Sequence, residues 1–238
     1  MNNFFKMDQL TYSQEQIQAE QASFISKVYG WMGVGLLLTG LVAWYTAQSE
    51  AMLQFIFGNQ IVFFGLILGE LALVGVLAGL VRRMSALTTT LIFLFYSALN
   101  GLTLSFVFLV YTSESISTTF FVTSLTFGIM SAYGYFTKKD LTSLGNMMGM
   151  ALIGIIIASL VNMFFHNEAL YWIITYVGVL VFVGLTAYDT QKIKEMNIIG
   201  NEGTDEDRKE AIMGALTLYL DFINLFLMLL RLLGNRRD

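Results

Sequence analysis

The sequence predicts an all-α polytopic membrane protein, a seven-transmembrane-helix bundle with the last helix at its centre. Hydrophobic residues make up 56% of the 238 residues, charged residues only 13%, and the mean hydropathy is +0.66. Seven apolar stretches reach the length of about 20 residues that crosses a bilayer. Soluble domains usually carry about 25% charged residues, so the composition excludes a water-soluble globule.

The predicted spans are joined mostly by short connections, so sequence neighbours should be antiparallel neighbours in space. Residues 1–23 should form a polar cytosolic arm, and residues 24–238 a seven-helix transmembrane domain. The chain contains no proline, which favours unbroken helices. The spans are expected at Phe24–Ala47, Phe55–Val81, Leu87–Tyr111, Ile116–Phe136, Leu141–Phe165, Ala169–Thr190 and Ala211–Leu233.

Composition also narrows the possible functions. The absence of cysteine excludes disulfides, thiolate metal sites and cysteine nucleophiles. A net charge of −4 leaves no basic surface for nucleic acid, so the expected partner is the lipid bilayer, and no cofactor is predicted. The only histidine, His166, lies in a predicted non-cytosolic loop, which argues against a serine protease. The last span has no lysine for a retinal Schiff base.

Basic residues predict the orientation. Loops after the first, third and fifth spans contain no lysine or arginine, which places the N-terminus and the basic loops in the cytosol. Arg231, Arg236 and Arg237 depart from this pattern, because they lie outside if the last helix spans. Either the C-terminus is an exception or the last segment is re-entrant. The residues that follow the pattern are Lys6, Lys27, Arg82, Arg83, Lys138, Lys139, Lys192, Lys194, Arg208 and Lys209.

Ionisable residues inside apolar spans are costly in lipid and therefore informative. Asp221 lies near the middle of the last span. The other residues on its helical face are Gly214, Thr217, Asn224 and Met228, whereas leucine, isoleucine and phenylalanine dominate the rest of the helix. Such a seam should face the bundle interior, which places the last helix centrally. The alternative for Asp221 is an internally hydrogen-bonded structural role.

Asp189 ends the sixth span and is followed by Lys192 and Lys194, so an interfacial anchor is the alternative to a functional role. Counted along the helices, Asp221 lies about 15 Å deep, whereas Asp189 lies near the surface. This mismatch shrinks if the last helix begins in water, at the N-cap pattern Thr204-Asp-Glu-Asp. The residues alone leave open whether the two carboxyl groups meet.

Glu70 lies inside the second span, and Arg82 and Arg83 follow at its cytosolic end. A straight helix separates Glu70 from Arg82 by about 18 Å, so they do not pair within one helix. The two arginines are most simply topology signals. Asn224 is interpreted as an interhelical hydrogen-bond donor.

Two motifs carry a family resemblance: Tyr188-Asp-Thr-Gln-Lys, and the segment from Leu216 to Arg231, Leu-Thr-Leu-Tyr-Leu-Asp-Phe-Ile-Asn-Leu-Phe-Leu-Met-Leu-Leu-Arg. Both closely resemble the transmembrane Bax inhibitor motif family, and the chain is most similar to its bacterial inner-membrane members. The resemblance implies a cell inner membrane protein whose last helix is wrapped by the other six.

The resemblance also implies a site. In that family two aspartates act as a pH-sensing latch on a calcium leak, and Asp189 and Asp221 fall at their motif positions. A helix 2 glutamate and an arginine help to hold the closed state, which suggests Glu70 with Arg82 or Arg83, supported by Asn224. This chain departs from the family pattern in the spacing of these residues, in a longer linker between the aspartates, and in lacking a Gly-Pro.

The leading hypothesis is a proton-gated cation leak. Two carboxyl groups that share a site do not both ionise cheaply, so Asp189 and Asp221 should hold a proton whose loss drives the helices apart. The two carboxylates would then be oxygen ligands for calcium as the transported ion. The alternative is a non-transporting regulator or interaction partner of a membrane protease. An intramembrane aspartyl protease is disfavoured, because Leu218-Tyr-Leu-Asp replaces Gly-x-Gly-Asp, so no enzyme is expected.

Overall fold

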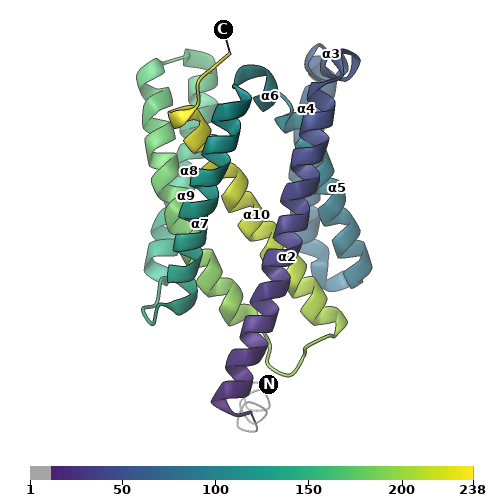
Figure 1. Ribbon diagram of the computed structural model, residues 1–238, viewed down its shortest axis with the longest axis vertical. Coiled ribbons are helices and arrows are strands. Elements are labelled where there is room, and N and C mark those ends of the chain that lie inside the picture. The colour runs from purple at the N-terminus through teal and green to yellow at the C-terminus, as the bar shows by residue number, and fades with distance from the viewer. Residues whose placement is uncertain (1–11, 238) are drawn as a thin grey trace.

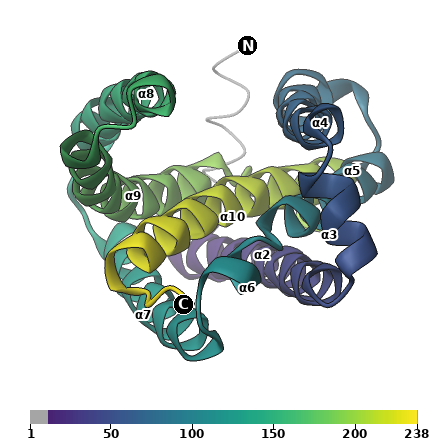
Figure 2. The same ribbon diagram turned by 90° about the horizontal axis from the view of Figure 1, so that it is seen from above.

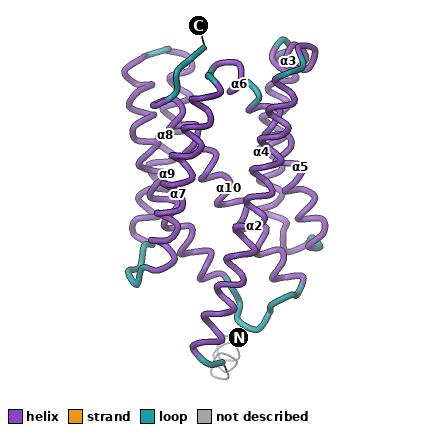
Figure 3. The backbone as a smooth tube through the Cα atoms, in the orientation of Figure 1, coloured by secondary structure: helices purple, strands orange, loops and turns teal. Residues whose placement is uncertain are grey.

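The computed structural model describes residues 12–237, which form a bundle of long helices (Figure 1). Within this range the backbone is almost entirely helical and contains no strand, and the connecting loops are short (Figure 3). Seven helices are long and apolar enough to cross a membrane, which confirms the predicted fold class. The elements are α2 (Gln14–Ala47), α3 (Glu50–Phe57), α4 (Gln60–Leu80), η2 (Val81–Arg83), α5 (Ala86–Leu104), α6 (Val107–Val110), α7 (Ser113–Phe136), α8 (Thr142–Phe165), α9 (Glu168–Met196) and α10 (Asp205–Leu233).

Polar N-cap residues start most of these helices. The cap side chain accepts a hydrogen bond from a backbone N–H two or three residues ahead, which satisfies a donor that the helix itself leaves free. Thr204, predicted as the N-cap of the last helix, caps α10 in this way. The other such caps are Ser13, Ser49, Asn59, Ser85, Thr112 and Asn167.

Several helix ends differ from the predicted spans. Helix α2 begins at Gln14, so residues 14–23 of the predicted arm are helical, while residues 1–11 lie outside the described range. Phe55 belongs to the separate helix α3, α9 continues to Met196, and α10 begins at Asp205. A hydropathy pattern identifies the apolar part of a helix, whereas the polar turns that continue it into water carry no such signal.

Helix α10 occupies the centre of the bundle, as predicted. Figure 2 shows it crossing the middle of the molecule, with α2 and α7 on one side and α4 and α8 at the periphery. In its most apolar part 72% of α10 is buried, against 6% for α4 and for α8. Because α10 runs unbroken to Leu233, the described chain ends opposite α2's first turn, and the re-entrant alternative is wrong (Figure 1).

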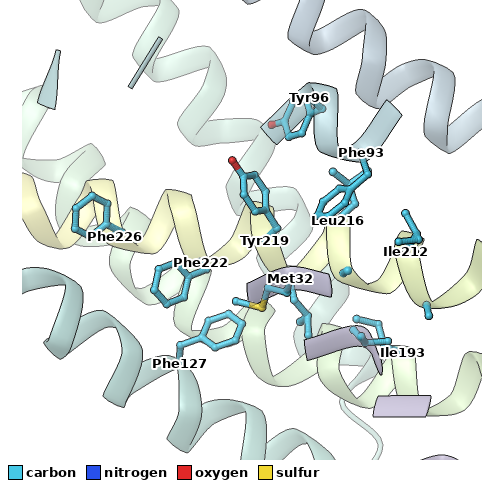
Figure 4. Close-up of a cluster of buried hydrophobic side chains, with 14 of the residues drawn as sticks. Met32, Phe93, Tyr96, Phe127, Ile193, Ile212, Leu216, Tyr219, Phe222 and Phe226 are labelled. Carbon is cyan, nitrogen blue, oxygen red and sulfur yellow. The ribbon is translucent and has the colours of Figure 1, made fainter. Parts of the chain in front are cut away.

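Aromatic and aliphatic side chains pack around α10 in the core (Figure 4), and small hydroxyl residues are buried in the same bundle. Tyr219 is fully buried and meets Phe93 and Tyr96 edge to face, with ring centroids 6.0 and 5.8 Å apart. Buried hydroxyls such as Thr123 and Thr186 donate to the carbonyl four residues earlier, at 2.7 Å in both cases. Buried hydroxyls of this kind therefore face inward with their donors satisfied, while large apolar side chains lie on the outer surface of the bundle.

The glycines that allow close helix contacts are mostly not those spaced as Gly-x-x-x-Gly, the pattern that commonly permits close crossings of membrane helices. A Cβ added to Gly65, Gly69 or Gly79 of α4 would meet nothing within 4 Å. By contrast, Gly134 of α7 lies directly against the backbone of Ala187 in α9, where no side chain fits. Spacing alone therefore did not identify the helix crossings.

Candidate functional site

Asp189 and Asp221 meet where α9 and α10 cross. Their carboxyl groups lie within hydrogen-bonding distance of each other. Asp221 is only 5% exposed, and Asp189 is half-buried. An ionised Asp221 would leave its Oδ2 without a donor among residues 12–237, whereas a proton held between the two groups supplies one. The structure therefore brings together the two acids whose contact the sequence left open.

The orientation of α10 removes the depth mismatch. From Asp205 to Asp221 the helix rises about 24 Å along its own axis. However, α10 runs obliquely across the bundle in Figure 1, so much of this length is lateral displacement rather than depth. The helix also begins in the polar layer, with Asp205, Glu206 and Asp207 in its first turn. Together these features bring Asp221 to the level of Asp189.

Neither lysine that follows Asp189 pairs with it. Lys192 Nζ lies 3.1 Å from Glu195 Oε2. Lys194 Nζ donates to the Tyr135 carbonyl at 3.1 Å and lies 4.7 Å from the centroid of the Tyr135 ring. Asp189 is therefore not the lysine-paired interfacial anchor that the sequence offered as an alternative.

Small residues let α9 and α10 approach each other around the pair. A Cβ on Gly178 of α9 would lie 2.8 Å from the Met228 sulfur, and one on Gly214 of α10 would lie 3.0 Å from Ile193. The predicted seam of α10 thus faces α9 and the interior. Its two other polar members bond within the helix: Thr217 donates to the Met213 carbonyl, and Asn224 donates to Leu220 at 2.8 Å. The prediction that Asn224 makes an interhelical hydrogen bond is wrong.

Glu70 lies apart from the arginines with which the family resemblance associated it. Its carboxylate accepts a 2.8 Å hydrogen bond from Thr103 Oγ1 of α5. Arg82 and Arg83 form η2 at the end of α4 and make no ion pair with Glu70 in the described chain. A contribution of these three residues to a closed state remains a prediction.

Sequence reasoning missed two polar contacts around α10. The Tyr219 and Thr39 hydroxyls are 2.7 Å apart in the buried interface with α2. At the basic end, Lys27 Nζ lies 2.9 Å from Asp207 Oδ2, and Asp207 is 2% exposed. Tyrosine is common in apolar spans, and Lys27 also fits the charge pattern of the loops, so neither residue stands out in sequence. The N-cap pattern at Thr204 was the available hint for Asp207.

The aspartate pair offers two carboxylates rather than a cage for a resident metal. Within residues 12–237, no group of three or more His, Cys, Asp or Glu side chains is arranged to hold a metal ion. Structural calcium sites use six to eight oxygen ligands. Two carboxylates supply fewer oxygen ligands than such a site uses.

Comparison with known proteins finds similarity along the whole chain. A family model described as "Inhibitor of apoptosis-promoting Bax1" matches residues 21–238. The chain is 55% identical to inner membrane protein YbhL of Escherichia coli over 238 residues, covering all of both chains. It is 45% identical to an uncharacterized protein of Borreliella burgdorferi over 232 residues, covering 98% of this chain and 100% of that one. An uncharacterized protein of Rickettsia prowazekii, RP147, is 47% identical over 220 residues and 90% of each chain.

Proposed function

This chain belongs to the Bax1 inhibitor family of membrane proteins, and from that premise we propose that it is a pH-sensitive cation leak channel of the inner membrane, gated by Asp189 and Asp221. The observation that carries the proposal is the meeting of two carboxyl groups at the crossing of α9 with the central helix α10. Buried carboxyl groups in membrane helices are costly and commonly mark ion or proton pathways.

The pair supplies a proton-dependent link between two helices. With one proton shared, the carboxyl groups hydrogen-bond and hold α9 against α10. Without it, two negative charges face each other in a site largely removed from water, where their repulsion is much stronger than in bulk solvent. Deprotonation therefore favours separation of α9 from α10, and flux should rise as the pH rises.

Calcium is the proposed cargo rather than a bound cofactor. Once separated, the two carboxylates present the hard oxygen ligands that calcium takes. Calcium itself comes from the family resemblance, since two carboxylates also attract other cations. Two ligands bind weakly, which suits a conduction pathway because the ion must leave as readily as it enters.

The aspartyl protease alternative is not favoured by the surroundings of Asp221. Helix α10 continues without a break from Asp205 to Leu233, so the backbone beside the acid is fully hydrogen-bonded within the helix. The family description names no enzymatic reaction. A non-transporting regulator or partner of a membrane protease is the remaining alternative, and the flux experiment separates it from the leak.

The experiment measures calcium entry into liposomes that contain the purified protein and an entrapped calcium indicator, over a range of external pH. Wild type should show flux that rises with pH. Asp221→Asn keeps the shape of the side chain but removes its charge, so flux should lose its pH dependence. Glu114→Gln is the matched control, because Glu114 is an exposed acid in the first turn of α7, at the end of the bundle opposite the first turn of α10. Absence of flux from wild-type protein would favour the non-transporting regulator.

A further inference from the structure

Three arginines stand at the end of the bundle that the orientation rule leaves free of basic residues. Arg231 lies in the last turn of α10, and Arg236 and Arg237 follow this helix, at the end opposite the first turn of α2 (Figure 1). The proposed leak does not use them. Basic residues on the non-cytosolic side oppose the usual insertion preference, so their position calls for a local reason.

Two of these arginines line a cavity of about 560 Å³ between the end of α10 and the α8–α9 connection. His166 and Tyr171 line the same cavity, together with Trp172. Glu168, in the first turn of α9, is the acidic residue among the described lining residues. The described lining of this cavity thus carries two guanidinium groups and one carboxylate.

Aromatic side chains, rather than acids, hold the two guanidinium groups in place. Arg231 lies 5.7 Å from the centroid of the Tyr171 ring. The Arg236 guanidinium lies beside the Tyr111 and Tyr171 hydroxyls. No carboxylate of residues 12–237 lies within 4.0 Å of either guanidinium. These contacts use only part of the donor capacity of two guanidinium groups.

The segment after α10 is fixed in a way that positions Arg236. Its backbone runs antiparallel to residues 110–112, with Arg237 N donating to the Val110 carbonyl at 2.9 Å and Thr112 N donating to Asn235 at 3.2 Å. Asn235 N donates to Ser115 Oγ at 2.9 Å. A Cβ on Gly234 would come within 2.7 Å of the Tyr111 ring, so the bend requires glycine. The backbone that carries Arg236 is therefore fixed before any ligand arrives, which lowers the cost of ordering this residue on binding.

We propose that this cavity binds a phosphate group, either on a phospholipid headgroup or free in solution. Guanidinium groups match phosphate oxygens with paired N–H donors, and an aromatic support leaves those donors available. Tyr171 and Trp172 belong to the residue types that concentrate at the bilayer interface, where lipid phosphates lie. The inference is independent of the aspartate pair and of cation flux.

The test measures binding to the full-length protein purified in a neutral detergent. One arm titrates inorganic phosphate by calorimetry, and the other compares retention of phosphatidylglycerol with that of diacylglycerol by native mass spectrometry. Arg231→Gln and Arg236→Gln should each lower the binding affinity at least about tenfold, because each substitution removes charge-assisted hydrogen bonds. Arg237→Gln is the matched control, since Arg237 does not line the cavity.

The two arms assign the source. If the variants lose binding of phosphatidylglycerol but show no change with inorganic phosphate, the site binds a lipid headgroup. If the variants lose binding of inorganic phosphate, the site binds the free anion. If Arg231→Gln does not fold, Tyr171→Phe replaces it, because that variant keeps the ring but removes a hydroxyl that holds Arg236, and several-fold weaker binding is expected. Absence of binding to wild type, or equal binding by wild type and folded Arg236→Gln, overturns the proposal.

Discussion

Asp189 and Asp221 should be treated as one titrating unit rather than as two acids. Their carboxyl groups are in contact, and Asp221 is 5% exposed. When two ionisable groups interact this closely, protons leave in steps that belong to the pair. Removing either charge then abolishes the same repulsion.

This shared repulsion predicts non-additive mutations. Asp189→Asn and Asp221→Asn should each remove the pH dependence of flux, and the double variant should differ from either single variant by much less than the sum of their effects. Independent sites usually add within about 0.3–0.5 kcal/mol. The measurement is the initial rate of calcium entry against pH for the four proteins. Additive effects would separate the two acids and return each to a role of its own.

The rule that ionisable residues in lipid are informative found both aspartates in the sequence. It did not find Tyr219, whose hydroxyl lies 2.7 Å from that of Thr39 in the interface between α10 and α2. Tyrosine has a large apolar ring, so its occurrence in a span carries little information until the partner is known. Residue type therefore predicted the two aspartates, whereas the contact between Tyr219 and Thr39 became visible only in the fold.

At the scale of elements, the first turns of α2 contact the linker between α9 and α10 and the first turn of α10. This linker connects the helix that carries Asp189 to the helix that carries Asp221. Lys27 contacts Asp207 at 2.9 Å and Glu202 at 3.4 Å. Ser23 donates to Glu202 at 2.6 Å. Glu20 accepts a 2.8 Å hydrogen bond from the backbone N–H of Gly200, which has the left-handed φ of 90° that glycine permits.

These contacts predict unequal losses of stability. Lys27→Met leaves the buried Asp207 carboxylate without its cation and should lower the free energy of unfolding by about 1–3 kcal/mol. Glu202→Gln breaks an exposed contact and should cost less than about 1 kcal/mol. Thermal unfolding of the detergent-purified variants by circular dichroism measures the difference. A larger loss for Glu202→Gln would show that Asp207 does not need Lys27.

The same linker contacts do not supply a pH response near neutrality. The hydrogen bond from Ser23 and the Lys27 ammonium lower the pKa of Glu202 below its ordinary value of 4.5. Stability from this group is therefore complete above that value and is lost as the pH falls through the lowered pKa. A pH dependence of flux near pH 7 would have to originate elsewhere, which keeps the test of the aspartate pair separate.

The pairing of elements was less predictable than the elements themselves. The sequence indicated seven helices and a central last helix, because hydropathy and the polar seam are properties of one segment. The close contact of Gly134 with Ala187 depends on two segments that are remote in sequence. The glycines of α4 have the spacing of a close contact but no neighbour within 4 Å. Small residues permit close approach, and the tertiary arrangement decides where it is used.

At the scale of the whole molecule, the described basic residues other than the last three gather at the end of the bundle where α2 begins and α10 starts. If that end is cytosolic, as the charge pattern predicts, cysteines at Gln60, Glu114 and Ala169 should react with a membrane-impermeant thiol reagent added outside intact cells. Cysteines at Lys138 and Ser143 should not react. All five positions are exposed and the chain has no natural cysteine.

The choice of positions matters for that measurement. Asn59, Thr112 and Asn167 lie at the same ends but cap helices, and replacing a cap costs about 1 kcal/mol. Residues beside them report the same side without this loss. Labelling of Lys138→Cys and Ser143→Cys but not of the other three would reverse the orientation.

The central position of α10 also constrains how the protein assembles. This helix follows six other spans in the chain, so the ribosome releases it after its future neighbours have entered the bilayer. Before it arrives, hydroxyls such as Ser97, Thr123 and Thr186 already donate to carbonyls of their own helices. The earlier helices can therefore reside in lipid with these hydroxyl donors already hydrogen-bonded within each helix. Docking of α10 is then the step that joins the helices. Nascent chains interrupted before Asp205 would be inserted yet unassembled, and these are the chains that membrane quality control would have to remove.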